Sequence, residues 1–146
     1  MIRFAQIALC AFVVLAVAGC PPGDNGDDSN LKATVTSHYI LIKACDTVVD
    51  AKDPTSRKTR VPHGEWAVWI NESNDDVTLE FGNVRKLFGV ESKTILAGAR
   101  DSLQVLQDAH PTDRNSPPFE HEYRPKCFGG TQPGPVIIVP PPGQGG

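Results

Sequence analysis

Short segments in which apolar and polar residues alternate are the feature that most constrains how this chain can fold. The alternation runs through residues 77–82 and 102–105, and again through residues 119–127. A period of two places one face of a strand on a core and the other face in water. Residues 39–42 and 136–139 are apolar on both faces, which predicts two more deeply buried strands. The chain is therefore expected to be built mainly from strands.

Turn-forming residues separate these segments. Glycine, proline and short polar residues gather at residues 63–64, 71–75, 97–98 and 133–135. Short strands punctuated in this way predict an all-β fold, an antiparallel β-sandwich. No segment has the pattern of a long amphipathic helix, although residues 83–88 suit a short helical turn. About 110 residues lie between the two polar ends, which is enough for one domain with one core.

The N-terminal residues predict export. A basic start at Arg3 precedes an uncharged apolar run from Ile7 to Ala18. As a helix this run would span about 18 Å, whereas the hydrocarbon of a membrane is roughly 30 Å thick. The run therefore suits a secretory signal and not a transmembrane anchor.

The residues Val17-Ala18-Gly19-Cys20, which follow that run, resemble the lipobox of bacterial lipoproteins. The resemblance implies that residues 1–19 are a signal peptide, that cleavage occurs before Cys20, and that the Cys20 thiol carries diacylglycerol. The mature protein would then be anchored by lipid to a bacterial membrane, with its domain outside the cytoplasm. An ordinary secreted protein whose Cys20 falls at the cleavage site is the alternative.

Composition divides the rest of the chain. Residues 20–30 follow the cleavage site and contain almost no apolar side chain apart from prolines, so we expect a lipidated cysteine and a flexible tether. The β-sandwich domain is predicted over residues 31–139, and residues 140–146 are predicted to be a disordered tail. Loss of Arg3 leaves 17 acidic and 13 basic residues, a net charge of −4 with neutral histidines. That charge indicates no nucleic-acid partner.

The residues Val61-Pro62-His63-Gly64-Glu65-Trp66-Ala67-Val68-Trp69-Ile70-Asn71 are similar to a strand pair typical of cupredoxins. In that family a valine strand, a Gly-Asp turn and a Val-x-Trp-x-Asn strand lead into the first copper-ligand loop. The resemblance continues through residues 77–81, 95–98 and 123–127, and it ends with residues 136–139. It implies a Greek-key, cupredoxin-like β-sandwich. An immunoglobulin-like sandwich is the alternative fold.

The copper ligands of that family do not carry over. A blue-copper centre needs two imidazoles and a thiolate, usually with a weak axial methionine. The first histidine of the family would fall near Asp76 or Val77, and neither is an imidazole. Cys127 matches the family's cysteine, but residues 128–135 contain neither histidine nor methionine, and Gln132 alone cannot replace them. We therefore expect no cofactor and no metal site.

The number of cysteines in the mature chain favours a structural role for Cys127. Cys10 leaves with the signal peptide and Cys20 is the predicted lipid carrier, so Cys45 and Cys127 remain. Two thiols in an exported domain usually pair, which predicts a disulfide between an early and a late strand. Parity along residues 119–127 predicts that the Cys127 sulfur faces the core. Two free thiols are the alternative.

Other candidate chemistry is weak. Glu120-His121-Glu122 suggests a metal or acid–base cluster, but on a strand His121 points away from both glutamates. The other histidines are scattered along the sequence: His38, His63 and His110. No nucleophile elbow, phosphate-binding glycine loop or zinc-binding helix motif is present. We expect no enzymatic activity.

Two tryptophans are the candidate partner contacts. Trp66 and Trp69 have opposite parity on one predicted strand, so one is expected to pack inward and the other to face outward. An outward tryptophan is a natural anchor for a partner, whereas burial of both is the alternative.

Taken together, the expected function is that of a non-catalytic binding or structural module at the cell envelope. Its expected partners are the membrane, through the lipid anchor, and an unknown envelope protein or small ligand. The second hypothesis is a copper-binding or redox protein that uses Cys127 with histidines converging in space. That hypothesis requires a free thiolate, because a disulfide does not bind copper.

Overall fold

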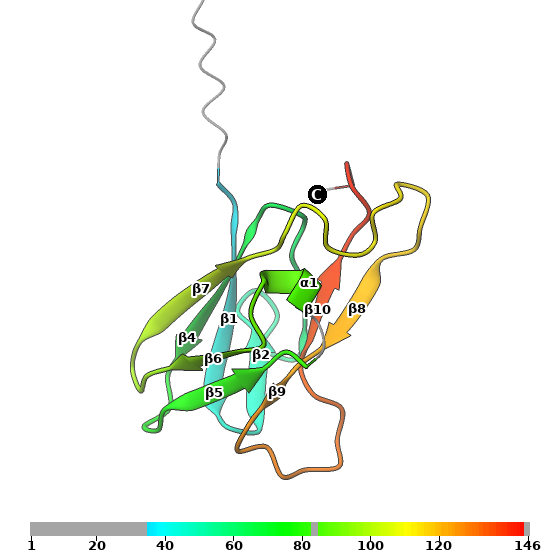
Figure 1. Cartoon of the computed structure of the whole chain (residues 1–146). Coiled ribbons are helices and arrows are strands. Elements are labelled where there is room, and N and C mark those ends of the chain that lie inside the picture. The colour runs from blue at the N-terminus through cyan, green and yellow to red at the C-terminus, as the bar shows by residue number, and fades with distance from the viewer. Residues whose placement is uncertain (1–34, 83–84, 145–146) are drawn as a thin grey trace, which may run out of the picture. The chain divides into compact units, whose positions relative to one another are not determined.

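A computed structural model describes residues 35–82 and 85–144, where the chain forms ten strands and one short helix (Figure 1). The predicted signal peptide and tether, residues 1–30, lie outside the described residues. In chain order the elements are β1 (Ser37–Ala44), β2 (Thr47–Asp50), β3 (Lys58–Arg60), β4 (Trp66–Asn71), β5 (Val77–Glu80), α1 (Arg85–Phe88), β6 (Ser92–Ile95), β7 (Arg100–Gln104), β8 (Phe119–Glu122), β9 (Arg124–Pro125) and β10 (Val136–Val139). The predicted all-β class is confirmed, and the helix is a single turn.

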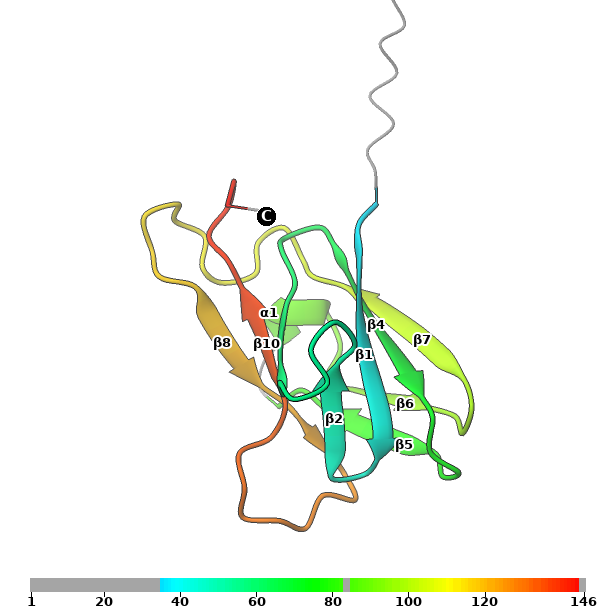
Figure 2. The ribbon, with the colours of Figure 1, turned by 180° about the vertical axis from the view of Figure 1, so that it is seen from behind.

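The strands form three sheets. One sheet has four strands in the order β2-β1-β4-β7, which lie side by side in Figure 2. The other two have the orders β3-β10-β8 and β6-β5-β9. β8 is followed by β9 after the single residue Tyr123, so one stretch of chain joins these two smaller sheets. Buried side chains from all three sheets meet in one core.

Strand direction is mixed. Among the described residues, five of the seven strand pairings are antiparallel, but β1 runs parallel to β4, and β3 runs parallel to β10. The parallel pairs arise because β3 belongs to a different sheet, so the chain leaves the four-stranded sheet after β2 and returns at β4. Alternation shows which face of a strand is buried but not which strand lies beside it.

The core is centred on Trp69, which is fully buried. Its ring packs edge-on against Phe88 and Tyr123, with ring centroids 5.5 and 6.0 Å apart. Its indole Nε1 donates a hydrogen bond of 3.1 Å to the Tyr123 hydroxyl, so the buried polar atoms of the pair satisfy each other. Burial raises the pKa of Tyr123, which keeps the hydroxyl neutral at physiological pH.

The C-terminal boundary differs from the predicted one at residue 139. Pro140 and Pro141 are buried, and Arg60 donates a hydrogen bond of 2.6 Å to the Gln144 carbonyl oxygen. Proline loses almost no side-chain freedom when it packs, so this polar-looking segment is ordered at little entropic cost. The described part of the predicted tail, residues 140–144, therefore belongs to the domain.

Candidate functional site

A disulfide closes one end of the sandwich. Cys45, in the turn between β1 and β2, is bonded to Cys127, which follows β9; their Cα atoms are 5.9 Å apart and 82 positions apart in sequence. The predicted pairing is confirmed. The predicted core-facing sulfur is wrong, because Cys127 is exposed. The chain turns after β9, where the Phe128 amide donates to the Pro125 carbonyl oxygen at 2.8 Å, and this turn ends the strand parity.

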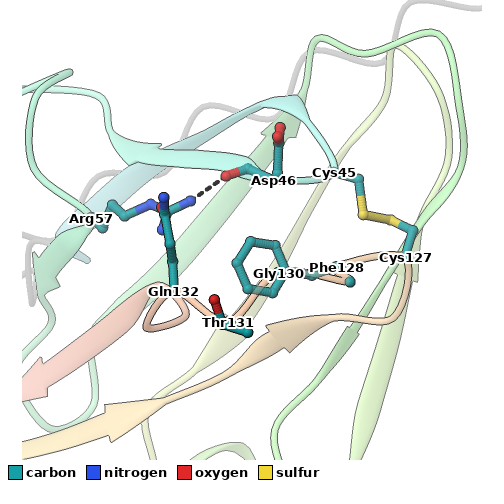
Figure 3. Close-up of a pocket in the computed structure, with 9 residues that line it drawn as sticks. Cys45, Asp46, Arg57, Cys127, Phe128, Gly130, Thr131 and Gln132 are labelled. Carbon is teal, nitrogen blue, oxygen red and sulfur yellow. Dashed lines mark hydrogen bonds between the residues drawn. A yellow bond between two sulfur atoms is a disulfide. The ribbon is translucent and has the colours of Figure 1, made fainter.

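One side of the disulfide borders a hollow of about 480 Å³. Figure 3 shows Phe128 standing in this hollow between the disulfide and Arg57, with the backbone of residues 129–132 curving beneath it. The Arg57 guanidinium carbon lies 5.7 Å from the centre of the Phe128 ring. The hollow therefore combines a cation, an aromatic face, a disulfide and the polar side chains of Thr131 and Gln132.

Arg57 holds the two walls of this hollow together. Its guanidinium donates one hydrogen bond to the Asp46 carbonyl oxygen, drawn dashed in Figure 3, and one of 3.0 Å to the Pro133 carbonyl oxygen. The loop ends at Gly134, whose amide donates to the Glu122 carboxylate at 2.9 Å. A Cβ at Gly134 would lie 2.5 Å from the Tyr123 carbonyl oxygen, so only glycine fits this close approach.

The other side of the disulfide borders a second hollow, of about 410 Å³, lined mainly by residues 72–77. Asn71 builds this rim from beneath: it is 1% exposed, and its side-chain amide donates to the carbonyl oxygens of Asp75 and Ile95 at 2.8 and 3.0 Å. Its oxygen accepts hydrogen bonds from the Ser73 amide and hydroxyl, at 3.1 and 2.6 Å. One buried amide thus shapes the whole loop.

The second hollow is lined by the positions that would hold the first histidine and the cysteine of a cupredoxin copper site. Asp76, Val77 and Cys127 all line it. The Asp76 carboxylate accepts a hydrogen bond of 2.9 Å from the Ala97 amide, and the Cys127 sulfur is bonded to Cys45. Within residues 35–82 and 85–144, no three His, Cys, Asp or Glu side chains lie close enough together to hold a metal ion. The donors present here do not fit a blue-copper centre, which needs imidazoles and a thiolate.

None of the four histidines lines either hollow. His38 Nε2 donates to the Glu65 carboxylate at 2.5 Å, and His63 Nε2 donates to the Ala109 carbonyl oxygen at 2.7 Å. The rings of His110 and His121 both lie near Phe119, with centroids 6.2 and 4.4 Å from the centroid of its ring. The convergence of histidines on Cys127, required by the copper hypothesis, is therefore wrong.

His121 is buried, and the glutamates beside it in sequence do not share its face of the strand. It is 6% exposed, whereas Glu120 and Glu122 are exposed on the opposite face of β8, as the strand geometry predicts. Within the described residues neither ring nitrogen of His121 has a hydrogen-bond partner of good geometry, although the His110 backbone lies close enough to raise the pKa of His121 against the larger effect of burial. Burial lowers the pKa of His121, so the neutral imidazole is favoured.

The two tryptophans separate as their parity predicts. Trp69 is fully buried in the core, so it is wrong as a partner contact. Trp66 is half-buried on the opposite face of β4 and stays a candidate for such a contact.

The sequence does not reveal the role of two residues that shape this site. Arg57 looks like part of a solvated basic turn, and its acceptor at Pro133 lies 76 positions away. Asn71 ends the segment that is similar to the Val-x-Trp-x-Asn strand of cupredoxins, but that resemblance does not indicate that its side chain organises the rim of the second hollow. In both cases most partners are backbone carbonyl or amide groups, which nearly every residue has. The hydrogen bonds therefore cannot be predicted from a pattern of side chains.

Comparisons with known proteins find a similar fold only. No protein family model matches the sequence, and no curated protein sequence matches it. Three solved structures of variants of amicyanin, a cupredoxin, are similar. Two are Cu(I) forms changed at a methionine: one has 15% identity, covers 73% of this chain and 87% of its own, with a TM-score of 0.42. The other is 13% identical and covers 70% of this chain and 81% of its own, with a TM-score of 0.41.

The third is a reduced Cu(I) form at pH 4 of a proline-to-glycine variant. It is 11% identical and covers 75% of this chain and 87% of its own, with a TM-score of 0.41. Similarities this distant assign neither copper binding nor a function to this chain. No helix within the described residues is long and apolar enough to cross a membrane.

Proposed function

We propose that the mature chain is a cell-envelope lipoprotein, anchored to a bacterial membrane through lipid on Cys20, whose cupredoxin-like sandwich is a non-catalytic binding module. The observation that carries the non-catalytic part is the state of Cys127. It occupies the family's thiolate position, yet its sulfur is bonded to Cys45 and no imidazole lines the adjoining hollow. The anchor is supported by the lipobox-like residues before Cys20.

The binding part of the proposal places a small polar ligand beside the disulfide. Ligand pockets commonly measure about 300–1,000 Å³, and the hollow between Arg57 and Phe128 falls in that range. Hydrogen bonds and the disulfide hold the walls of the hollow in place. The loss of conformational entropy on ligand binding should therefore be small. An envelope protein that inserts a side chain into the same hollow is the second kind of partner.

The anchor is tested by metabolic labelling. Cells that express the full chain are grown with a clickable fatty acid, and the purified protein is examined for label and intact mass. We expect label on the native chain and none on Cys20→Ser. Label that persists in Cys20→Ser, or its absence from the native chain, overturns the anchor.

The state of the thiols is tested on the same protein. We expect no alkylation without reductant, two alkylated thiols after reduction, and no visible thiolate-to-copper absorption when the unreduced protein is titrated with Cu(II). Two alkylated thiols before reduction, together with that absorption or a reproducible one-electron redox wave, would restore the copper hypothesis and sink the binding-module proposal.

A further inference from the structure

The outer face of the four-stranded sheet is apolar although it does not face the core. Inward positions of β1 and β4 are buried as expected, including Ile40, Ile42 and Trp69. The outward positions between them, which we call the outer face, are also apolar: Tyr39, Leu41, Trp66, Val68 and Ile70. Tyr39 is 44% exposed, and the other four are half-buried. Strands with one face in water normally alternate, so this face is expected to meet something other than water.

The charged side chains at outward positions of β1, β4 and β7 are basic. On the neighbouring strand β7, Arg100 pairs in register with Ile70 and is exposed. No Asp or Glu occupies an outward position on β1, β4 or β7, all of which are described. Arg100 and Tyr39 line a shallow hollow of about 320 Å³ together with Val68 and Asp101. The Asp101 carboxylate forms an ion pair with Lys93 at 2.7 Å, which offsets its negative charge. The face therefore suits an occupant that is apolar and bears negative charge at its surface.

The described part of the chain begins beside this face. Ser37, at the start of β1, pairs in register with Trp66. Residues 21–34 separate Cys20 from Val35, and a flexible chain of that length reaches about 20 Å. On the proposed lipid anchor, on which this step rests, the outer face lies within reach of the membrane surface. Trp and Tyr suit that surface because each has an apolar body and a polar tip.

We propose that the outer face docks on the membrane that holds the anchor, with Trp66 and Tyr39 among the headgroups and Arg100 toward anionic phosphates. A tether of this length would hold the face at a local concentration in the millimolar range. A contact with a dissociation constant of about 1 mM, too weak to bind vesicles from solution, would then leave roughly half of the anchored molecules docked. A second copy of the chain fits less well, because two facing copies would bring Arg100 side chains together with no carboxylate on either outer face to pair them.

Docking is tested on the mature lipoprotein reconstituted into vesicles, after its intact mass has shown the lipid. Lipids brominated near the headgroup quench tryptophans that touch them, and Trp69 is shielded by its burial. We expect roughly half of the Trp66 emission to be quenched in vesicles that contain phosphatidylglycerol, with less quenching in neutral vesicles or high salt. Trp66→Phe should leave only unquenched Trp69 emission.

A matched pair of variants identifies the surface. Tyr39→Glu should abolish the quenching of Trp66, whereas Leu96→Glu, at a residue 59% exposed and outside the outer face, should leave it unchanged. Lipidated protein whose Trp66 is not quenched, or equal effects of the two variants, overturns the docking. A dimer in sedimentation that Tyr39→Glu dissolves would assign the face to a second copy instead. Protein without lipid on Cys20 defeats the proposed anchor, which is a separate outcome.

Discussion

At the scale of single residues, His121 is a buried group whose protonation should make the stability of the fold depend on pH. Burial lowers its pKa from the ordinary value of 6.5, and neither ring nitrogen has a hydrogen-bond partner of good geometry within the described residues. As pH falls below that value, the unfolded chain takes up a proton before the folded chain does, so the free energy of unfolding should decline. We expect His121→Phe to remove this part of the decline and to add about 1 kcal/mol of stability at pH 7, measured by urea unfolding from pH 5 to 8.

The control for that prediction is His110→Gln. His110 is exposed, and its backbone and charge affect the pKa of His121 less than burial does, so its replacement should leave most of the pH dependence in place. If His121→Phe and the native chain lose stability in parallel below pH 6.5, the decline comes from other groups and the buried imidazole is not its cause.

Asn71 is the second residue whose partners determine a prediction. Its side chain serves four backbone groups and one hydroxyl in a loop that borders the second hollow. Asn71→Ala leaves buried carbonyl oxygens without donors, so we expect the free energy of unfolding to fall by about 2–3 kcal/mol. Asn74→Ala, at an exposed position in the same loop, should change it by less than about 0.5 kcal/mol. Similar urea midpoints for the two variants would contradict this role.

At the scale of elements, alternation predicts the buried face of most strand residues but not of Phe119 in β8, which is 47% exposed although it shares the parity of His121 and Tyr123. Val77 and Leu79 of β5 are at most 1% exposed, and His121 of β8 and the following Tyr123 are buried as well. The same parity fails at Cys127 because the chain has already turned, and a turn made by backbone hydrogen bonds leaves no mark in the side-chain pattern. Strands are thus predictable from their faces, whereas their ends and neighbours depend on contacts distant in sequence.

Arg57 couples two elements that the sequence keeps apart. Its guanidinium joins the β1–β2 turn to the loop after Cys127. We expect Arg57→Gln to speed amide hydrogen exchange in residues 128–133, because the loop loses a donor and its contact with Phe128. Arg60→Gln, which removes a hydrogen bond to Gln144 instead, should leave exchange in that loop unchanged. Unchanged exchange in Arg57→Gln would mean that the disulfide alone holds the loop.

At the scale of the whole molecule, composition misjudges what a polar-looking segment can do. Pro140 and Pro141 have no apolar pattern around them, yet both are buried. The candidate site shows the same division. Its covalent bond follows from counting cysteines in an exported chain, but the hollows beside it depend on Arg57 and Asn71 meeting backbone groups of distant segments. Bonds that only one residue type can form are readable from sequence, whereas hydrogen bonds to the main chain are not.

Within the described residues, the disulfide joins an early turn of the domain to a late loop by a covalent bond, in addition to hydrogen bonds such as that of Arg57 with Pro133. It closes a loop of 82 residues, and the chain-entropy model assigns such a loop about 4.5 kcal/mol of stabilisation through restriction of the unfolded state. We therefore expect the double variant Cys45→Ser/Cys127→Ser to unfold at a much lower urea concentration than the native chain. The native chain in reductant should match the double variant, which separates loss of the crosslink from any effect of serine. A difference below about 1 kcal/mol would mean that the packing around Trp69 already holds these segments together, and that the disulfide serves the geometry of the hollows and not the stability of the fold.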